Sequence, residues 1–515
     1  MSYIIEQKVK GRIYLYEVES YWDKEKKQAR QRRVYIGPKD KKNKTSLKAK
    51  IRDIISKNIG NIELFQTIVN NTGLGEILKN TFPGYYNEIL ALAYYNIMQN
   101  EPTYLFPYWL DEQYLPTVKK MHSSDISNLY DQIGGMQRQR LEFIRQWIEH
   151  IKPIGGIYYD ITSISSYSSK IDFIEWGYNR DKENLPQLNL GLVCNQRNSL
   201  PFFYTVFPGS VVDVSTLKNA IHYLKLFKLE GILLVLDRGF CSTSNIIELN
   251  NDENKIKFIQ PLSFSMKIVK ELIFSHKSAL HDSHTAFKFN DEIIHHTLTQ
   301  TVIGGEQFDA HIFLNEKAEV DQKNNFLSKL LEIEEGFKNK EFQTAEDYKN
   351  YSNDNLPDKY KKYYQWDKQT KKIERDDKNI NTYMSNIGYF VLATNEKNTD
   401  KSFILSSYRD RDGIEKIFDI YKNETDSNRL RVHSQWNVEG KFFIKFITVI
   451  IYMSISRIMK DYKLYDKYTI REMILELKKI KLTLINPSEE TIVSEITKKQ
   501  RELLEAFNVH LNHSY

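Results

Sequence analysis

The order of the apolar runs between residues 155 and 263 most restricts the folds open to this chain. Three strand-like runs come first, and a helical pattern, a strand-like run, a second helical pattern and a last strand-like run follow. Three successive strands and a helical crossover to a fourth strand predict a mixed sheet flanked by helices. We therefore expect an α/β domain whose ligands gather where its strands end.

Two of these strand-like runs end in an aspartate. The run IYYD ends at Asp160, and the apolar run Ile232 to Leu236 is followed by Asp237. Short β-branched and aromatic runs that end in a polar residue and a turn are typical of buried central strands. Carboxylate oxygens are hard ligands suited to Mg²⁺ or Mn²⁺. The two aspartates are therefore candidate metal ligands.

A third acid, Glu415, lies in the stretch YRDRDGIEKIFDIYK. Tyr408, Arg411, Glu415 and Lys422 follow one another at intervals of three, four and seven residues. At about 100° per residue these side chains share one stripe of a single helix. A carboxylate flanked by groups that bind phosphate oxygens indicates phosphoryl-transfer chemistry. The alternative is a solvated helix face with chance charges, because 27% of the residues are charged.

Taken together, the three acids and their flanking residues resemble the DDE transposases of bacterial insertion sequences. The resemblance is to the group whose third acid lies in a tyrosine-arginine-glutamate-lysine helix, called the YREK signature. The intervals of that signature are met without a departure, and DRGF at Asp237 matches the family's second-acid motif. The resemblance covers residues 155 to 464 well and the first 150 residues loosely. It implies a ribonuclease H-like catalytic core, in which the first and fourth strands lie side by side.

The resemblance also implies a mechanism. Asp160, Asp237 and Glu415 would hold two Mg²⁺ or Mn²⁺ ions, which support in-line displacement at phosphorus. Hydrolysis would expose 3′-hydroxyls at the terminal inverted repeats, and these would then attack target DNA in a cut-and-paste reaction. A hairpin step for the second strand and a homodimer in the DNA complex are family expectations. Two alternatives stay open: a metal-dependent DNA nuclease on the same fold, which cuts without joining, and a domesticated DNA-binding regulator.

Several residues near the acids are predicted DNA contacts. Arg411 and Lys422 would hold phosphates, Tyr408 would donate a hydrogen bond to one, and Arg238 would lie at the rim. A basic stretch then leads into a long apolar helix, which the family packs against its core. Taken singly, such residues are more often plain surface cations. The second-rank contacts predicted in this stretch are Arg429, Arg431, His433 and Lys441.

Asp237 and Glu415 are separated by 178 positions, which is far more than a connecting loop requires. We expect an insertion at residues 264–386 and a return to the core in a buried strand at Ile387 to Asn395. The family has a mostly β insertion here that helps to hold the DNA end. Trp366 is its candidate for stacking on a flipped base, an interaction worth about 1–3 kcal/mol. The alternative is that Trp366 helps to close a small core.

The first 50 residues are strongly basic. Between Lys24 and Lys50 there are twelve lysines and arginines against two acids. This excess predicts a contact with a polyanion, to which we assign Arg30, Arg32 and Arg33. The alternative is a solvated basic hairpin and linker. Alternating residues from Ser2 to Pro38 predict a β-hairpin, and residues 123–148 permit either a DNA-binding helix-turn-helix or a purely structural helix pair.

These patterns predict five regions. They are a basic β-hairpin region (1–45), a helical DNA-end-binding region (46–152), a catalytic core (153–263 with 387–464), a mostly β insertion (264–386) and a helical C-terminal region (465–515).

Cysteine content and hydropathy indicate the compartment. Cys194 and Cys241 offer neither a disulfide framework nor zinc spacing, which fits a reducing cytoplasm. The N-terminus does not have the pattern of a signal peptide. The apolar stretch Phe446 to Ser456 has eleven residues, against about 20 that a bilayer span needs. We expect a buried helix there and a cytoplasmic protein without membrane contact, associated with the nucleoid when it is on DNA.

Overall fold

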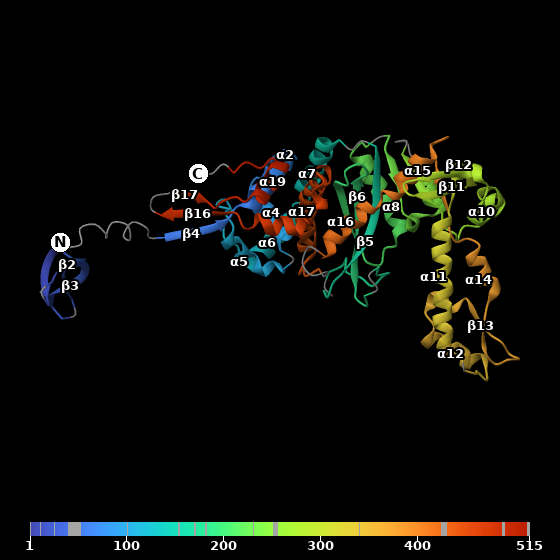
Figure 1. Ribbon diagram of the computed structural model, residues 1–515, viewed down its shortest axis with the longest axis horizontal. Helices are drawn as coiled ribbons and strands as arrows, with labels where there is room; N and C mark the ends of the chain where they lie inside the picture. The colour runs from blue at the N-terminus through green and yellow to red at the C-terminus, as the bar shows by residue number, and fades with distance from the viewer. Residues whose placement is uncertain are drawn as a thin grey trace. The chain divides into compact units, whose positions relative to one another are not determined.

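The structure is a computed structural model that divides into two compact units (Figure 1). The terminal unit comprises residues 1–68, 107–120 and 458–515, and the central unit comprises residues 69–106 and 121–457. The residues that the structure describes are 2–10, 12–24, 26–39, 53–99, 101–152, 155–168, 171–180, 183–229, 231–250, 256–338, 340–423, 430–486 and 490–511.

The terminal unit contains two small antiparallel sheets. In the first, β2 (Arg12–Asp23) pairs with both β1 (Ser2–Val9) and β3 (Gln28–Pro38), so the predicted hairpin is present with one more strand. In the second, β16 (Lys481–Asn486) pairs with β17 (Glu490–Val493) and with β4 (Asp53–Asn58). Segments from opposite ends of the chain thus share one sheet. The helices assigned wholly or mainly to this unit are α2 (Gly60–Asn71), α5 (Phe106–Glu112), η4 (Leu464–Asp466), α18 (Ile470–Leu477) and α19 (Lys498–Ala506).

Helices on one side of the central unit pack around α17 (Gln435–Asp461). The predicted helix pair of residues 123–148 is confirmed as α6 (Ser123–Gly135) and α7 (Gln137–Ile151). A Cβ at Gly134 would collide with the carbonyl oxygen of Trp436, and a Cβ at Gly440 would collide with that of Tyr130. The backbones of α6 and α17 therefore touch, so α6 is part of the core packing. The other helices here are α3 (Leu74–Thr81), α4 (Tyr86–Met98) and η1 (Thr103–Leu105).

The helix α17 is the most apolar long helix of the described chain. By length and composition it could cross a membrane, but 78% of its most apolar stretch is buried inside the protein. Phe446, Ile447 and Ile450 are fully buried in it. The predicted buried helix at residues 446–456 is thus confirmed, within a longer element.

A nine-stranded mixed sheet forms the other part of the central unit. Its strand order is β10-β11-β12-β15-β9-β8-β5-β6-β7. The predicted succession of three strands, helix, strand, helix and strand is confirmed as β5, β6, β7, α8, β8, α9 and β9. The side-by-side placement of the first and fourth strands is also confirmed, because β5 and β8 pair in parallel. These elements are β5 (Gly156–Ser165), β6 (Gln187–Asn195), β7 (Pro201–Pro208), α8 (Asp213–Leu226), β8 (Leu233–Val235), α9 (Thr243–Asn250) and β9 (Lys257–Pro261).

The segment 264–386 differs from the mostly β insertion that we expected. After α10 (Lys267–Leu280) and η3 (Ser283–Thr285), three strands extend the large sheet, because β12 pairs directly with β15 (Tyr389–Thr394). The remainder is chiefly helical, so the expectation of a mostly β insertion is wrong. The strands are β10 (Ala286–Phe289), β11 (Glu292–Ile303) and β12 (Glu306–Asn315), and the rest is α11 (Glu316–Glu335), α12 (Ala345–Asn355), α13 (Asp358–Lys361), β13 (Tyr364–Trp366), β14 (Ile373–Arg375) and α14 (Asp377–Met384).

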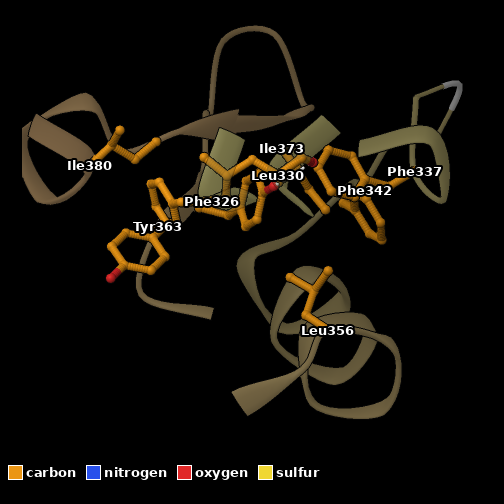
Figure 2. Close-up of a cluster of buried hydrophobic side chains, with 9 residues drawn as sticks. Phe326, Leu330, Phe337, Phe342, Leu356, Tyr363, Ile373 and Ile380 are labelled. Carbon is orange, nitrogen blue, oxygen red and sulfur yellow. Dashed lines mark hydrogen bonds between the residues drawn. The ribbon is translucent and has the colours of Figure 1, made fainter. Parts of the chain in front are cut away.

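Residues 316–386, which we call the lobe, have a hydrophobic core of their own (Figure 2). Phe326 and Leu330 of α11 lie in this core together with Tyr363 and Ile373. Trp366 packs against this cluster, and its Nε1 donates a hydrogen bond to the carbonyl oxygen of Phe342 at 3.0 Å. The indole therefore contributes to a small core, which is the alternative that the sequence left open for it.

Two histidines of the large sheet are held neutral. His296 Nε2 and His311 Nδ1, on β11 and β12, lie 3.0 Å apart in a hydrogen bond. Burial lowers the pKa of His296 to about 3, helped by neighbouring His311 and Lys401. Burial also lowers the pKa of His311 to about 4, against the opposing charges of Asp309 and Asp400. Protonating either ring in the folded protein is therefore unfavourable.

This pair predicts acid-sensitive stability. A histidine with a depressed folded pKa stabilises the fold above its unfolded pKa of about 6.5, and that stability is lost as the pH falls toward the folded value. Between pH 7 and pH 5 we expect a loss of about 2 kcal/mol per histidine. His296→Gln should reduce the loss in the free energy of unfolding, measured in urea, whereas exposed His284→Gln should leave it unchanged. Equal pH profiles for all three proteins would contradict this account.

Candidate active site

Two aspartates lie side by side on adjacent parallel strands, Asp160 in the middle of β5 and Asp237 just beyond the end of β8. The expectation that the first strand ends at Asp160 is wrong, because β5 continues to Ser165. In the register of β5 and β8, Tyr158 pairs with Val235. Asp160 and Asp237 each follow two residues later in the sequence. The two acids therefore lie at the same level of the sheet. Asp160 Oδ1 accepts a hydrogen bond from the backbone N–H of Ile161 at 2.8 Å. Asp237 caps the short helix η2 (Arg238–Phe240), where its Oδ2 accepts from the N–H of Gly239 at 3.4 Å.

The stretch that contains the third acid is two helices and not one. α15 (Lys401–Arg409) includes Tyr408, α16 (Asp412–Asn423) includes Glu415 and Lys422, and Arg411 lies in the turn between them. The prediction of a single helical stripe is therefore wrong. Asp410, the C-cap residue of α15, lies in this turn with Arg411. Short polar side chains favour helix ends because they compete for backbone hydrogen bonds.

The helix break lets Arg411 face the sheet. Its guanidinium forms an ion pair with Asp237, and its Nη2 lies 3.5 Å from Glu415 Oε1. The carbon of the guanidinium lies 5.9 Å from the centre of the Tyr408 ring. The side chain of Arg411 is only 16% exposed. Arg411 thus links the second and third acids in this structure.

The site controls the charge of its acids. Burial raises the pKa of Asp160 to about 7, and the negative charge of Asp237 adds to this effect while Arg411 opposes it. Burial also acts to raise the pKa of Asp237, but Arg411 outweighs it and the pKa is lowered. Burial raises the pKa of Tyr408, so its phenol stays neutral and able to donate a hydrogen bond. Asp160 therefore needs a further cation nearby to be fully ionised at neutral pH.

The donor chemistry of the three acids fits a divalent cation. Asp160 and Asp237 are adjacent, and Arg411 connects Asp237 to Glu415, whose side chain is 60% exposed. In the described parts of the chain, no three histidine, cysteine, aspartate or glutamate side chains form a ready ligand set. Carboxylates suit Mg²⁺ or Mn²⁺. The chemistry of a metal site is thus present, and Arg411 lies among its donors.

Two residues that the sequence analysis missed adjoin the acids. Arg180 forms an ion pair with Asp213, at the start of α8, and its Nη1 donates a hydrogen bond to Ser163 Oγ at 3.2 Å. A Cβ at Gly239 would lie 3.0 Å from Asp213 Oδ2, so the glycine of DRGF leaves room for this carboxylate. The charge of Arg180 acts to lower the pKa of Asp160. In the sequence, Asp213 could be noticed as the acid at the start of the helical pattern that becomes α8. No sequence feature distinguished Arg180 from other arginines.

The remaining predicted contacts are dispersed. Arg238 is exposed, with its guanidinium carbon 5.6 Å from the centre of the Phe264 ring. Lys422 is half-buried in the last turn of α16. Arg431, His433 and Lys441 line one hollow of about 140 Å³. Trp366 lies in the lobe, whereas Arg30, Arg32 and Arg33 lie on β3 of the terminal unit and Arg429 falls outside the described residues.

Comparison with known proteins identifies the family. Residues 152–451, more than half of the chain, match the family model described as "Transposase DDE domain". No curated protein matches the chain. Among solved structures, the piggyBac transposase synaptic complex with hairpin DNA is similar at 10% identity, 81% coverage of this chain, 70% coverage of that chain and a TM-score of 0.35, too low to support an argument. The family match spans Asp160, Asp237 and Glu415, and the chain belongs to the transposase DDE domain family and is an enzyme of the DDE transposase class.

Proposed function

We propose that this transposase mobilises a bacterial-type insertion sequence of the YREK group. It would bind the terminal inverted repeats, cleave the element ends by metal-dependent hydrolysis and join their 3′-hydroxyls to target DNA in a cut-and-paste reaction. The observation that supports this most strongly is the placement of Asp160 and Asp237 at the same level of two adjacent parallel strands, beside Arg411 and Glu415. A cluster of acids with its own guanidinium suits attack on a phosphodiester.

We also propose that β5 to β9 with α8 and α9 form a ribonuclease H-like core. The support is the strand order, with three antiparallel neighbours β7, β6 and β5 followed by parallel β8 and β9. In this arrangement Asp160, midway along β5, lies level with Asp237, which follows the carboxyl end of the shorter strand β8. The sheet at this level would accept the DNA backbone.

The mechanism assigns a task to each side chain. Asp160, Asp237 and Glu415 would hold two Mg²⁺ or Mn²⁺ ions, which when bound activate the attacking oxygen and stabilise the leaving oxygen. Arg411 would exchange part of its contact with Asp237 for an oxygen of the scissile phosphate. The neutral phenol of Tyr408 would donate a hydrogen bond to the same group.

Outer contacts would hold the DNA backbone. Lys422 and exposed Arg238 would bind phosphates on either side of the scissile bond. Arg431, with His433 and Lys441 around one hollow, would bind a more distant phosphate. Trp366 would contact a base only if its packing against the lobe opened, and second-strand cleavage through a hairpin stays an expectation from the resemblance. We propose a homodimer in the DNA complex and a cytoplasmic location, on the nucleoid when DNA is bound.

The test is an assay of cleavage and joining on labelled DNA that contains the element ends. With Mg²⁺ or Mn²⁺ we expect a nick that leaves a 3′-hydroxyl and a second product joined to target DNA; both should be lost with a chelator. Cleavage without any joined product would favour the nuclease. Specific binding without cleavage on the correct ends would favour the DNA-binding regulator.

A further inference from the structure

The sheet β1-β2-β3 has two faces of different character. Alternate residues of a strand point to opposite faces. The register pairs Tyr3 with Val18 and Val18 with Arg33, and it pairs Tyr16 with Tyr35. We call the face that includes these residues the tyrosine face. It presents Tyr3, Tyr14, Tyr16, Trp22, Gln31, Arg33 and Tyr35 around Val18.

The rings of the tyrosine face are ordered by mutual contacts and yet open to solvent. The centre of the Tyr35 ring lies 5.9 Å from that of Tyr14 and 5.4 Å from that of Tyr16. Tyr3 Oη accepts a hydrogen bond from Gln31 Nε2 at 2.9 Å. Val18 beneath them is fully buried, whereas Trp22 is 63% exposed, Tyr35 52% and Tyr3 47%. The face therefore offers flat apolar surfaces that are already positioned.

Charge separates the two faces further. Every carboxylate in the described parts of these three strands lies on the opposite face, at Glu6, Glu17, Glu19 and Asp23. The cations there are balanced, since Arg30 Nε lies 3.4 Å from Asp23 Oδ2 and Arg32 is paired in register with Glu19. On the tyrosine face, Arg33 Nη2 lies 3.5 Å from Gln31 Oε1, a neutral amide. The tyrosine face thus combines aromatic rings with an arginine and no acid.

We propose that the tyrosine face binds single-stranded DNA, with bases stacked on Tyr35, Trp22 and Tyr3 and a phosphate held by Arg33. The inference rests on the proposed function, and it assigns unpaired nucleotides of the DNA to this surface. Aromatic faces in a positive field suit unpaired bases, since every base has a flat face that can stack. A second copy is a poorer occupant, because a two-fold contact of this face brings its own Arg33 side chains toward each other.

The proposal separates the three arginines that the sequence grouped together. Arg32 and Arg33 are neighbours on β3 and therefore point to opposite faces. Only Arg33 lies with the exposed rings. Arg30 and Arg32 would contribute through the general positive field of the region rather than through a contact with the bound strand.

The experiment measures binding of the full chain to a fluorescent oligothymidylate of about 20 nucleotides, longer than a typical single-strand site. Tyr35→Leu and Trp22→Leu should each raise Kd about 5- to 150-fold, the effect of losing one stacked base worth about 1–3 kcal/mol. Tyr35→Phe should keep the affinity. The matched control is Tyr21→Leu, on the opposite face and 48% exposed, which should change Kd by less than about twofold.

A second pair of variants tests the arginine. Arg33→Gln should reduce the slope of log K against log salt by about 0.7, the value for one phosphate contact on a single strand, and Arg32→Gln should reduce it less. Equal effects of Tyr21→Leu and Tyr35→Leu, no effect of any substitution, or a larger loss on duplex than on single-stranded DNA would each overturn the proposal. Because Trp22 is largely exposed, its variant decides the matter if Tyr35→Leu fails to fold.

Failure here is distinguishable from failure of the proposed function. Binding of oligothymidylate at the tyrosine face needs no divalent metal, so a chelator should leave this binding unchanged while it abolishes cleavage and joining. If the protein binds oligothymidylate as expected but shows no joining activity, the proposal for the tyrosine face stands and the transposase mechanism fails. Normal oligonucleotide binding by the Tyr35 and Trp22 variants would remove this inference and leave the transposase mechanism standing.

Discussion

Asp237→Asn protein is expected to bind element-end DNA normally and to cleave it at least about 10³-fold more slowly, a loss of about 4 kcal/mol of transition-state stabilisation. The amide keeps the size of the side chain but removes its charge. Asp237 is paired with Arg411 and lies at the level of Asp160. Its charge therefore orients the Arg411 side chain and raises the pKa of Asp160. Single-turnover cleavage of labelled ends measures the rate, and gel retardation measures the binding.

The matched control lies on the helix of the third acid. Glu415→Gln should lose activity to a similar extent, whereas Asp419→Asn should keep it, because Asp419 is an exposed acid of α16 that is not linked to Arg411. Wild-type rates in both Asp237→Asn and Glu415→Gln would show that the reaction takes place elsewhere. Equal losses of cleavage rate in all three variants would show that the rate depends on the overall negative charge of this region and not on a defined set of acids.

Gly134→Ala is expected to destabilise the central unit by roughly 2–4 kcal/mol, the range for severe overpacking. The added methyl group would meet the carbonyl oxygen of Trp436, which belongs to the rigid backbone of α17 and has no rotamer to change. The helices would have to move apart, which would disturb the contact of Arg140 with Glu439, 2.5 Å apart, and with the Gly134 carbonyl. Chemical denaturation followed by circular dichroism measures the change.

The neighbouring glycine provides the control for this prediction. A Cβ at Gly135 would meet no atom within 4 Å, and its backbone is helical. Gly135→Ala should therefore be neutral or stabilising by up to about 1 kcal/mol, because alanine loses less backbone entropy. If the two variants unfold at the same denaturant concentration, α6 and α17 do not pack as closely as described.

Local sequence patterns predicted where the strands and helices lie better than they predicted which strands pair with each other. The runs ending at Asp160 and Asp237 identified two buried strands, and the apolar stretch near Phe446 identified a buried helix. The pairing of β5 with β8 came from the family resemblance, because periodicity contains no information on which strands are neighbours. For the same reason the pairing of β12 with β15 was missed, and three strands of the large sheet were assigned to an insertion.

The candidate site shows a similar limit. The acids were predictable because each one follows a strong local pattern, but the spacing from Tyr408 to Lys422 fits a helix whether or not that helix is continuous. The break falls at Asp410 and Arg411. The competition of a short polar side chain with the helical backbone is a weak preference, so it does not by itself predict a break. Arg180 and Asp213 meet through the fold alone, since 33 positions separate them in the sequence.

The two ends of the lobe lie side by side, and this affects how its length can change during evolution. β12 and β15 are hydrogen-bonded neighbours, and the N–H of Asn315 donates to the carbonyl oxygen of Gly388 at 3.0 Å, just where the lobe begins and ends. The lobe is thus topologically an oversized hairpin loop. Its length can change without shifting the register of either strand, so evolution can enlarge, shorten or exchange it while the geometry of the acids on the sheet is preserved.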